Sequence, residues 1–234
     1  KTLGWPVIAE DPLSFPDALA HASIFLASPE IRSTLIPQSV LVIGRTTLSR
    51  SINAFIKSSP ITYVVDQRLA TVDTDRQADR KFTELPDLQG VIQSDEWIAK
   101  WAKVSERAQK LIASLDGWNE AVIARTIAAA VPNETALFVS SSRPIRDLEG
   151  FATPRTGIDV YANRGLAGID GNISTALGIA YAHKATIAVL GDLSFLHDLT
   201  GLINKEAINC RFIVINNDGG GIFSTLPQRG VNGF

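Results

Sequence analysis

The sequence has 234 residues, of which 45% are hydrophobic and 20% are charged, which is typical of one large or two small packed domains and excludes a disordered or fibrous chain. Its 22 Lys and Arg residues nearly balance its 24 Asp and Glu residues, which gives a net charge of -2. Because this balance provides no overall positive field, we expect no nucleic acid partner.

The sequence also argues against a membrane or secreted location. Its longest apolar stretches, such as residues 185–190, are far shorter than the ~20 residues that span a bilayer, so we expect no membrane insertion. Its single cysteine, Cys210, cannot form an internal disulfide, and no secretory leader precedes the first motif. These features favour a cytoplasmic location.

The first half of the sequence predicts a parallel βαβ unit. The spacing of apolar residues predicts a helix over 12–26, a strand over 39–43, a helix over 46–56 and a strand over 61–65. A strand, helix, strand order indicates parallel pairing. The polar segment 66–90 predicts solvated surface. The segment 94–115 predicts a helix in which Trp97 and Trp101 are core anchors.

A second unit is predicted to begin after Asp116 and Gly117. Its elements are, in order, a helix at 119–130, strands at 135–139 and 158–161, a helix at 172–182, a strand at 185–190, a helix at 194–204 and a strand at 211–215. Alternation of this kind is typical of a doubly wound sheet. The sequence therefore predicts an α/β protein with two doubly wound parallel-sheet domains, residues 1–116 and 117–234.

Two polar motifs follow the last two predicted strands. The first is Gly191-Asp192-Leu193-Ser194, in which the serine is expected to cap the next helix, and the second is Asn216-Asn217-Asp218 followed by three glycines. Either motif alone is ordinary turn chemistry. If the strands are neighbours, however, the Asp192 carboxylate, the Asn217 amide oxygen and a carbonyl of the glycine turn converge as ligands for Mg2+, with helix amides available for an anion. Together the motifs predict a magnesium diphosphate site.

These motifs resemble the signature of the thiamine diphosphate enzymes, in which Gly-Asp-Gly precedes Asn-Asn by a few tens of residues. Here Leu193 replaces the last glycine of the first motif. With Ser142-Arg143-Pro144-Ile145-Arg146-Asp147, Ala162-Asn163-Arg164-Gly165 and Gly168-Ile169-Asp170-Gly171, the sequence resembles a branch of that family that acts in menaquinone biosynthesis. The resemblance implies that residues 1–116 are a Rossmann-like middle domain, incomplete at its start. It implies that residues 117–234 are a diphosphate-binding domain, incomplete at its end, and that the pyrimidine-binding domain is missing.

The resemblance implies thiamine diphosphate and Mg2+, or Mn2+ in its place, as cofactors. Its implied metal ligands are Asp192, Asn217 and the carbonyl of Gly219. Other implied cofactor contacts come from the glycine, leucine and serine beside Asp192 and from three apolar residues, one beneath the cofactor and two that wall the pocket against water. These contacts are Gly191, Leu193, Ser194, Ile169, Ile222 and Phe223. The alternative for Ile169, Ile222 and Phe223 is ordinary burial in a hydrophobic core.

The activity that the resemblance implies is decarboxylation of 2-oxoglutarate followed by conjugate addition of the acyl carbanion equivalent to isochorismate. Both substrates carry carboxylates, which guanidinium groups bind with two parallel hydrogen bonds. Arg146 and Arg164 occupy motif positions suited to this role, and Ser142 is expected to hydrogen-bond an intermediate. Arg143, Arg155 and Arg211 have no such support.

Two alternatives remain open at this stage. One is a different thiamine diphosphate decarboxylase or an acetolactate-type synthase, against which Leu193 and the arginine pair argue, because pyruvate has no second carboxylate to bind. The other is a noncatalytic fragment. In the family a glutamate from the missing domain activates the cofactor across a subunit interface, so we expect a homodimer or homotetramer and an inactive chain when these residues stand alone.

Overall fold

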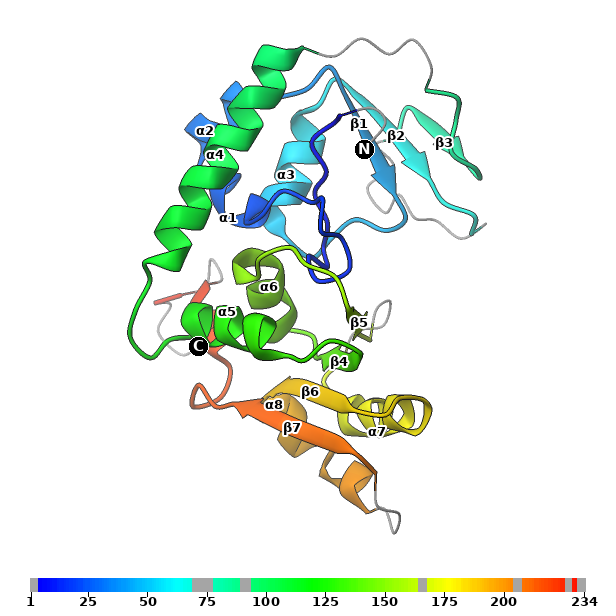
Figure 1. The fold of residues 1–234 in the computed structure, drawn as a ribbon, viewed down its shortest axis with the longest axis vertical. Coiled ribbons are helices and arrows are strands. Elements are labelled where there is room, and N and C mark those ends of the chain that lie inside the picture. The colour runs from blue at the N-terminus through cyan, green and yellow to red at the C-terminus, as the bar shows by residue number, and fades with distance from the viewer. Residues whose placement is uncertain are drawn as a thin grey trace. The chain divides into compact units, whose positions relative to one another are not determined.

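The computed structural model describes residues 4–68, 78–88, 94–163, 168–203, 208–225 and 229–230. The chain divides into two compact units (Figure 1), one formed by Lys1–Glu10 with Leu19–Ser114 and the other by Asp11–Ala18 with Leu115–Phe234. The short segment Asp11–Ala18 belongs to the second unit, where the backbone N–H of Arg155 donates to the Pro12 carbonyl at 3.1 Å. No helix in the described part of the chain is long and apolar enough to cross a membrane.

In the described part of the first unit, three strands form a parallel sheet in the order β1-β2-β3, namely β1 (Ser39–Ile43), β2 (Ile61–Val65) and β3 (Arg80–Phe82). The predicted strands β1 and β2 have the expected bounds, and helix α3 (Arg50–Ser58) connects them. Strand β3 falls in the segment that was predicted to be solvated surface. Its Arg80 and Lys81 are exposed, so it carries no apolar pattern that could have revealed it.

Trp101 is the centre of the first unit's core. It lies on α4 (Asp95–Ala113), is 2% exposed, and meets the rings of Phe25, Phe55 and Trp97 edge to face at centroid distances of 5.9, 5.3 and 5.8 Å. Such pairs add to the free energy of burial. The predicted role of this tryptophan as a core anchor is confirmed.

The helix predicted over 12–26 is wrong for most of its length. Only α1 (Ala22–Phe25) is helical there, and α2 (Pro29–Thr34) follows it as a separate helix. His21, just before α1, has a φ of 64°, a left-handed conformation that ends any helix approaching from the N-terminal side. Apolar spacing alone could not reveal this backbone reversal.

Within the described residues, the second unit contains a four-stranded parallel sheet and four α-helices. Its strands lie in the order β5-β4-β6-β7 and are β4 (Thr135–Val139), β5 (Ile158–Tyr161), β6 (Thr186–Gly191) and β7 (Cys210–Ile215). Its helices are α5 (Glu120–Ala130), α6 (Arg143–Phe151), α7 (Asn172–Ala182) and α8 (Asp192–His197). The sequence did not predict α6. The helix expected at 194–204 instead begins at Asp192, ends at His197, and is followed by the 3-10 helix η1 (Leu199–Leu202).

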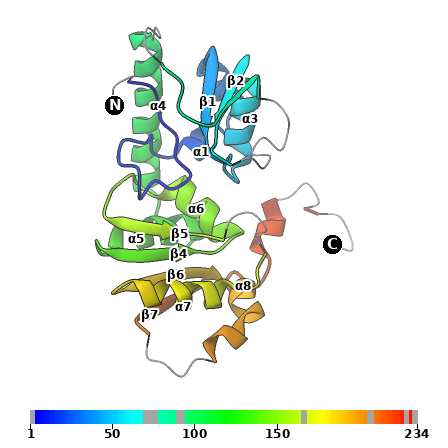
Figure 2. The same cartoon turned by 90° about the vertical axis from the view of Figure 1, so that its right-hand side faces the viewer.

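Alternate residues of the central strands point to opposite faces of this sheet. Leu137 and Val189 line one apolar cavity together with residues of α5 and α6. Phe138 and Leu190 pack against Ile173 of α7 on the other face. Figure 2 shows α6 on one side of the sheet and α7 and α8 on the other. The predicted α/β class with parallel sheets is confirmed, and this sheet is covered by helices on both faces.

Candidate metal and diphosphate site

Strands β6 and β7 are parallel neighbours, which is the arrangement that the magnesium prediction required. Their register pairs Gly191 with Ile215, the last residue of each strand. Asp192 and Asn216 therefore leave the sheet side by side at its carboxyl edge, where ligands of open α/β sheets bind. The pairing brings the two motifs together.

Asp192 is the first residue of α8, and both of its carboxylate oxygens accept backbone hydrogen bonds. Its Oδ1 accepts the N–H of Leu193 at 2.7 Å, while its Oδ2 accepts the N–H groups of Asn217 at 3.1 Å and Gly219 at 2.9 Å. The Asp192 carboxylate therefore holds Asn217 and Gly219 of the second motif beside the end of β6. It also satisfies a free N–H of the α8 N-terminus, where the helix dipole favours negative charge.

The prediction that Ser194 caps this helix is wrong. The N-cap position belongs to Gly191, which has no side chain to act as a cap, and Ser194 lies within the helix as a buried residue, 3% exposed. The N–H of Leu193, which the resemblance assigns to the diphosphate, donates to Asp192 in this structure. Leu193 itself has an exposed side chain.

The glycine-rich turn after Asn217 is built from left-handed residues. Asp218, Gly219 and Gly220 have φ values of 61°, 81° and 68°. Consecutive left-handed residues of this kind favour glycine. Gly221 leaves room for the Asn217 side chain, because a Cβ at this position would lie 2.4 Å from Nδ2 of Asn217. The backbone of the turn therefore lies close to the Asn217 side chain.

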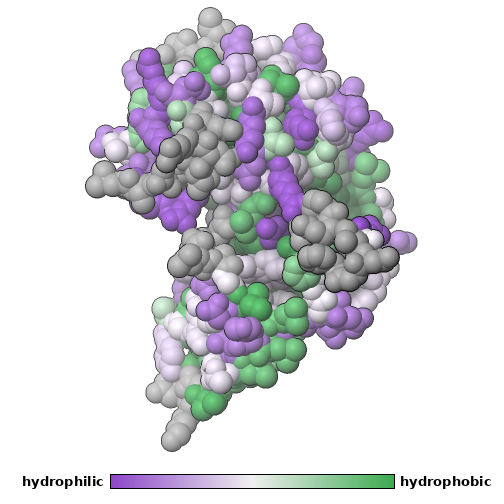
Figure 3. Space-filling view, turned by 180° about the vertical axis from the view of Figure 1, so that it is seen from behind, coloured by the Kyte–Doolittle hydropathy of each residue, from purple (hydrophilic) through white to green (hydrophobic). Residues whose placement is uncertain are grey.

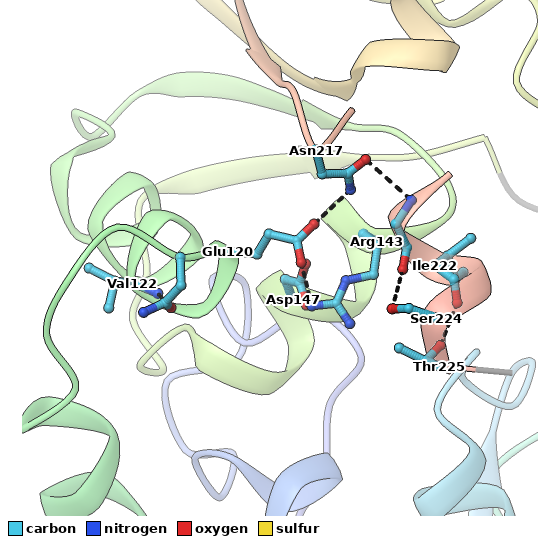
Figure 4. Close-up of polar contacts among 10 residues, drawn as sticks. Glu120, Val122, Arg143, Asp147, Asn217, Ile222, Ser224 and Thr225 are labelled. Carbon is cyan, nitrogen blue, oxygen red and sulfur yellow. Dashed lines mark hydrogen bonds and ion pairs between the residues drawn. The ribbon is translucent and has the colours of Figure 1, made fainter. Parts of the chain in front are cut away.

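Asn217 points its two carboxamide ends at different partners (Figure 4). Its Nδ2 donates to Oε1 of Glu120 at 2.8 Å, and its Oδ1 accepts the N–H of Gly221 at 3.3 Å. Glu120 in turn accepts Nη2 of Arg143 at its Oε2, at 2.9 Å. Sequence reasoning missed Glu120, which resembled an ordinary acidic residue in the first turn of a helix, and it set Arg143 aside.

Arg143 also pairs with Asp147 one helical turn away, at 3.1 Å from Oδ1. Asp147 is 3% exposed and lines the apolar cavity between α6 and the sheet, and its Oδ2 has no hydrogen-bond partner. Burial raises the pKa of Asp147 to about 7, and Glu120 adds to this effect, while Arg143 opposes it. Burial has the largest effect on this pKa, because Arg143 pairs with Oδ1 of Asp147 while Oδ2 is buried without a hydrogen-bond partner.

Two oxygen-bearing side chains at this edge of the sheet are of the chemical type that binds a hard divalent cation. The Asp192 carboxylate and the Asn217 amide oxygen are the oxygen ligands that Mg2+ prefers, and few protein ligands are needed when a diphosphate supplies the others. Among the described residues there is no group of three or more His, Cys, Asp or Glu side chains placed to hold a metal. The predicted site would not form such a group, because it combines a single carboxylate with amide and carbonyl oxygens.

The remaining predicted residues lie on several elements of the second unit. Ser142 has a φ of 76° and precedes α6, and Arg146 on that helix donates from Nη1 to the Ser142 carbonyl at 2.6 Å. Ile169 is 37% exposed in the bend before α7. Ile222 and Phe223 lie on the 3-10 helix η2 (Gly221–Thr225). Arg164 lies outside the described residues.

The exposure of Phe223 and the contacts of Arg155 were not expected from the sequence. Phe223 is 64% exposed, contrary to the burial that its hydrophobicity alone predicts. Arg155, to which no role was assigned from the sequence, has a structural role. Its Nη1 donates to the carbonyls of Ala128, Ala129 and Val131 at the C-terminal end of α5. These carbonyls have no partner within the helix, so the guanidinium acts as a C-terminal cap.

Comparison with known proteins identifies the class that this fold and site define. The family model described as the middle domain of thiamine pyrophosphate matches residues 1–139. The chain therefore belongs to the thiamine pyrophosphate enzyme family, as its motifs predicted.

Within this class the chain is similar to several synthases that share one name. It is 37% identical to the 2-succinyl-5-enolpyruvyl-6-hydroxy-3-cyclohexene-1-carboxylate synthase of Thermobifida fusca over 97% of its length, 33% identical to that of Bacillus cytotoxicus over 96%, and 31% identical to that of Staphylococcus aureus over 96%. It spans 44%, 42% and 42% of these relatives. The chain thus spans less than half of the length of each.

Proposed function

We propose that this chain contributes the diphosphate-binding and metal-binding part of a thiamine diphosphate-dependent synthase of menaquinone biosynthesis. The proposed reaction decarboxylates 2-oxoglutarate and adds the remaining four-carbon unit to isochorismate. The name of the relatives' product supports this choice, since it joins a succinyl group to a cyclohexene carboxylate that carries an enolpyruvyl substituent. The observation that carries the proposal is the pairing of β6 with β7, which brings Asp192 and Asn217 to one edge of the sheet.

In this proposal Asp192, Asn217 and the Gly219 carbonyl hold Mg2+, and the start of α8 faces the diphosphate. When bound, thiamine diphosphate would supply a cationic thiazolium ring that takes up the electron pair left by decarboxylation. The Asp192 carboxylate would retain its place at the turn, because its hydrogen bonds to Asn217 and Gly219 fix the turn against the sheet. Ile169, Ile222 and Phe223 would exclude water from the reacting atoms.

Arg146, Arg164 and Ser142 are proposed to bind the substrates. Arg146 is half-buried on α6, and the hydrogen bond from its Nη1 to the Ser142 carbonyl fixes the direction of the guanidinium. A fixed guanidinium binds a carboxylate with less loss of side-chain entropy. This arrangement favours dicarboxylate substrates over pyruvate, the substrate of the rival acetolactate-type synthases.

Self-association as a homodimer or homotetramer belongs to the same proposal. Large apolar side chains of α8, η1 and the residue after it are exposed, among them Leu196 at 59%, Leu202 at 43% and Ile203 at 84%. Figure 3 shows apolar surface gathered on the second unit. Contiguous exposed apolar surface is typical of a protein interface.

The test uses the full-length protein with thiamine diphosphate and Mg2+. We expect carbon dioxide release from 2-oxoglutarate, and a product whose mass equals the sum of isochorismate and the four-carbon unit. Turnover of pyruvate in place of 2-oxoglutarate would favour the acetolactate-type alternative. A protein trimmed to these 234 residues is expected to bind weakly and to release no carbon dioxide, and steady turnover by it would contradict the assignment.

A further inference from the structure

Glu120 lies far from Asn217 in the sequence but contacts it in the structure (Figure 4). It is the first residue of α5, whose N-terminus is capped by Oδ1 of Asn119 accepting the Val122 N–H at 3.0 Å. Its Oε1 accepts from Nδ2 of Asn217 at 2.8 Å across 97 positions of sequence, and its Oε2 accepts from Nη2 of Arg143 at 2.9 Å. The cap fixes where the helix begins, and the helix places this carboxylate beside the site.

A carboxylate in this position determines which way the Asn217 carboxamide faces. An ionised carboxylate can only accept hydrogen bonds, so the amide end that meets Glu120 is the Nδ2 donor. The oxygen, Oδ1, then lies at the other end, where the Gly221 N–H donates to it at 3.3 Å. A reversed carboxamide would set oxygen against oxygen at Glu120 and donor against donor at Gly221.

The backbone of the glycine turn also lies close to the Asn217 carboxamide. A Cβ added at Gly221 would lie 2.4 Å from Nδ2 and 2.7 Å from Cγ of Asn217, so the backbone of the turn packs directly against the carboxamide. The carboxamide is held between the Glu120 carboxylate and this backbone. Its orientation is therefore set by contacts on both sides.

Arg143 in turn fixes the carboxylate of Glu120. Its Nη2 lies 2.9 Å from Oε2 of Glu120 and 3.1 Å from Oδ1 of Asp147, so one guanidinium joins two carboxylates. The side chains of Glu120 and Arg143 are 27% and 26% exposed. A partly buried, charge-assisted pair of this kind holds its geometry better than a surface ion pair.

We propose that Glu120 is a positioning residue for the magnesium site. By accepting the Nδ2–H of Asn217 it keeps the amide oxygen available to the cation, and Arg143 keeps Glu120 in the place where it can do so. The inference rests on the proposed function, since it requires Asn217 to be a metal ligand. Glu120 touches neither the cation nor the cofactor, and acts through Asn217 alone. Partners that orient a metal ligand in this way typically change metal affinity by ~10- to 100-fold.

The experiment measures Mg2+ affinity by calorimetry in the full-length protein at saturating thiamine diphosphate. Glu120→Ala is expected to weaken Mg2+ binding by ~10- to 100-fold. In an Asn217→Ala background the same change is expected to have no further effect, because the residue through which Glu120 acts is gone. A merely structural role would instead weaken binding by the same factor in both backgrounds.

Two further variants separate the positioning effect of Glu120 from the effect of its negative charge at the N-terminus of α5. Glu120→Asp retains the negative charge at the N-terminus of α5 but is one methylene too short to reach Asn217, and it is expected to weaken Mg2+ binding as Glu120→Ala does. Glu134→Gln removes an exposed acidic residue of the same unit and is expected to leave the affinity unchanged. Thermal unfolding of the cofactor-free variants checks their folding, and Glu120→Asp carries the test if Glu120→Ala does not fold.

The outcomes separate this inference from the function on which it rests. A wild-type protein that fails to bind thiamine diphosphate with Mg2+ would overturn the proposed function and the positioning role with it. A wild-type protein that binds both, with Glu120→Asp and Glu120→Ala within twofold of it, would overturn the positioning role alone. Equal losses from Glu120→Ala in the presence and absence of the Asn217 side chain would do the same.

Discussion

The Oδ2 oxygen of Asp192 accepts the backbone N–H of Gly219 at 2.9 Å, although 27 positions separate the two residues. The Asp192 carboxylate thus has two roles. It supplies the negative charge of the proposed metal site, and it anchors the turn that carries the other proposed ligands. Asp192→Ala is expected to lower the affinity for thiamine diphosphate and Mg2+ by ~100-fold or more, since it removes the single carboxylate of the site together with its charge-assisted hydrogen bonds. Calorimetry on the full-length protein measures this.

Asp218→Asn provides the matched control for that experiment. Asp218 is exposed in the same turn, and asparagine tolerates its left-handed φ of 61°. Cofactor affinity is expected to stay at the wild-type value in this variant. If Asp192→Ala binds as tightly as Asp218→Asn, the metal assignment is wrong.

Arg146→Ala is expected to impair substrate use without affecting the cofactor. Loss of a charge-assisted contact of ~1.5 to 3 kcal/mol corresponds to a roughly ten- to hundredfold fall in kcat/KM for one of the two substrates. Arg146→Lys is expected to recover only part of the loss, because an ammonium group lacks the planar fork. Steady-state kinetics that vary 2-oxoglutarate and isochorismate separately would assign the arginine to one of them.

The same kinetics apply to Arg164, which lies outside the described residues, and Arg211→Ala is the control because Arg211 is exposed on β7. We expect Arg164→Ala to affect one substrate and Arg211→Ala to affect neither. Wild-type kinetics for both Arg146→Ala and Arg164→Ala, or a loss of cofactor affinity in their place, would remove the basis for preferring dicarboxylate substrates.

Asp147 is expected to make the stability of the protein depend on pH. Its pKa is raised to about 7 in the folded chain by burial, from an ordinary value near 3.8. The folded state therefore binds this proton more tightly than the unfolded state. The contribution of Asp147 to the free energy of unfolding should therefore fall as pH rises from about 4 to about 7, and level off above that.

Asp147→Asn removes this titration. Denaturant unfolding across the pH range should show the wild-type protein losing stability relative to Asp147→Asn as pH rises, by an amount on the order of a few kcal/mol. Asp159→Asn is the control, since Asp159 is 69% exposed. Parallel curves for the wild-type protein and Asp147→Asn would show that Asp147 ionises with its ordinary pKa.

Asp198 is expected to stabilise the start of α7. It is 8% exposed, and its Oδ2 accepts the backbone N–H of Ser174, the third residue of that helix, at 2.9 Å. Gly171, at the N-cap position, has no side chain for this purpose. Removing a cap typically costs ~1 to 2 kcal/mol, so Asp198→Ala should lower the urea midpoint accordingly. Asp198→Asn should lose less, and an equal loss in His197→Ala would argue against the cap.

Much of the fold follows from local sequence patterns. Strands β4 and β6 are buried and apolar, and both were predicted to within one residue. Helix α6 was missed because it contains Pro144 near its start and two charged residues, Asp147 and Glu149, that are nonetheless buried. Their burial depends on how α6 packs in the second unit, where Asp147 lines an apolar cavity with Leu137 and Val189 of the sheet, and such packing leaves no periodic signal in the sequence.

The candidate site divides in the same way. Asp192 and Asn217 could be proposed from sequence because each lies beside a strand end, which a local motif reveals. Glu120 could not, because its contact with Asn217 joins residues 97 positions apart and depends on where α5 lies against the sheet. Nor could the sequence reveal that Asp192, rather than Ser194, begins α8.

The register of β6 against β7 has a consequence for how such sequences vary. Since Gly191 pairs with Ile215, the separation of Asp192 from Asn217 is set by the width between two adjacent strands, not by the number of residues that connect them. Insertions or deletions in the connection can therefore accumulate without altering the metal geometry. A search for related sites should accordingly fix the two strand ends and leave the length of the intervening loop free.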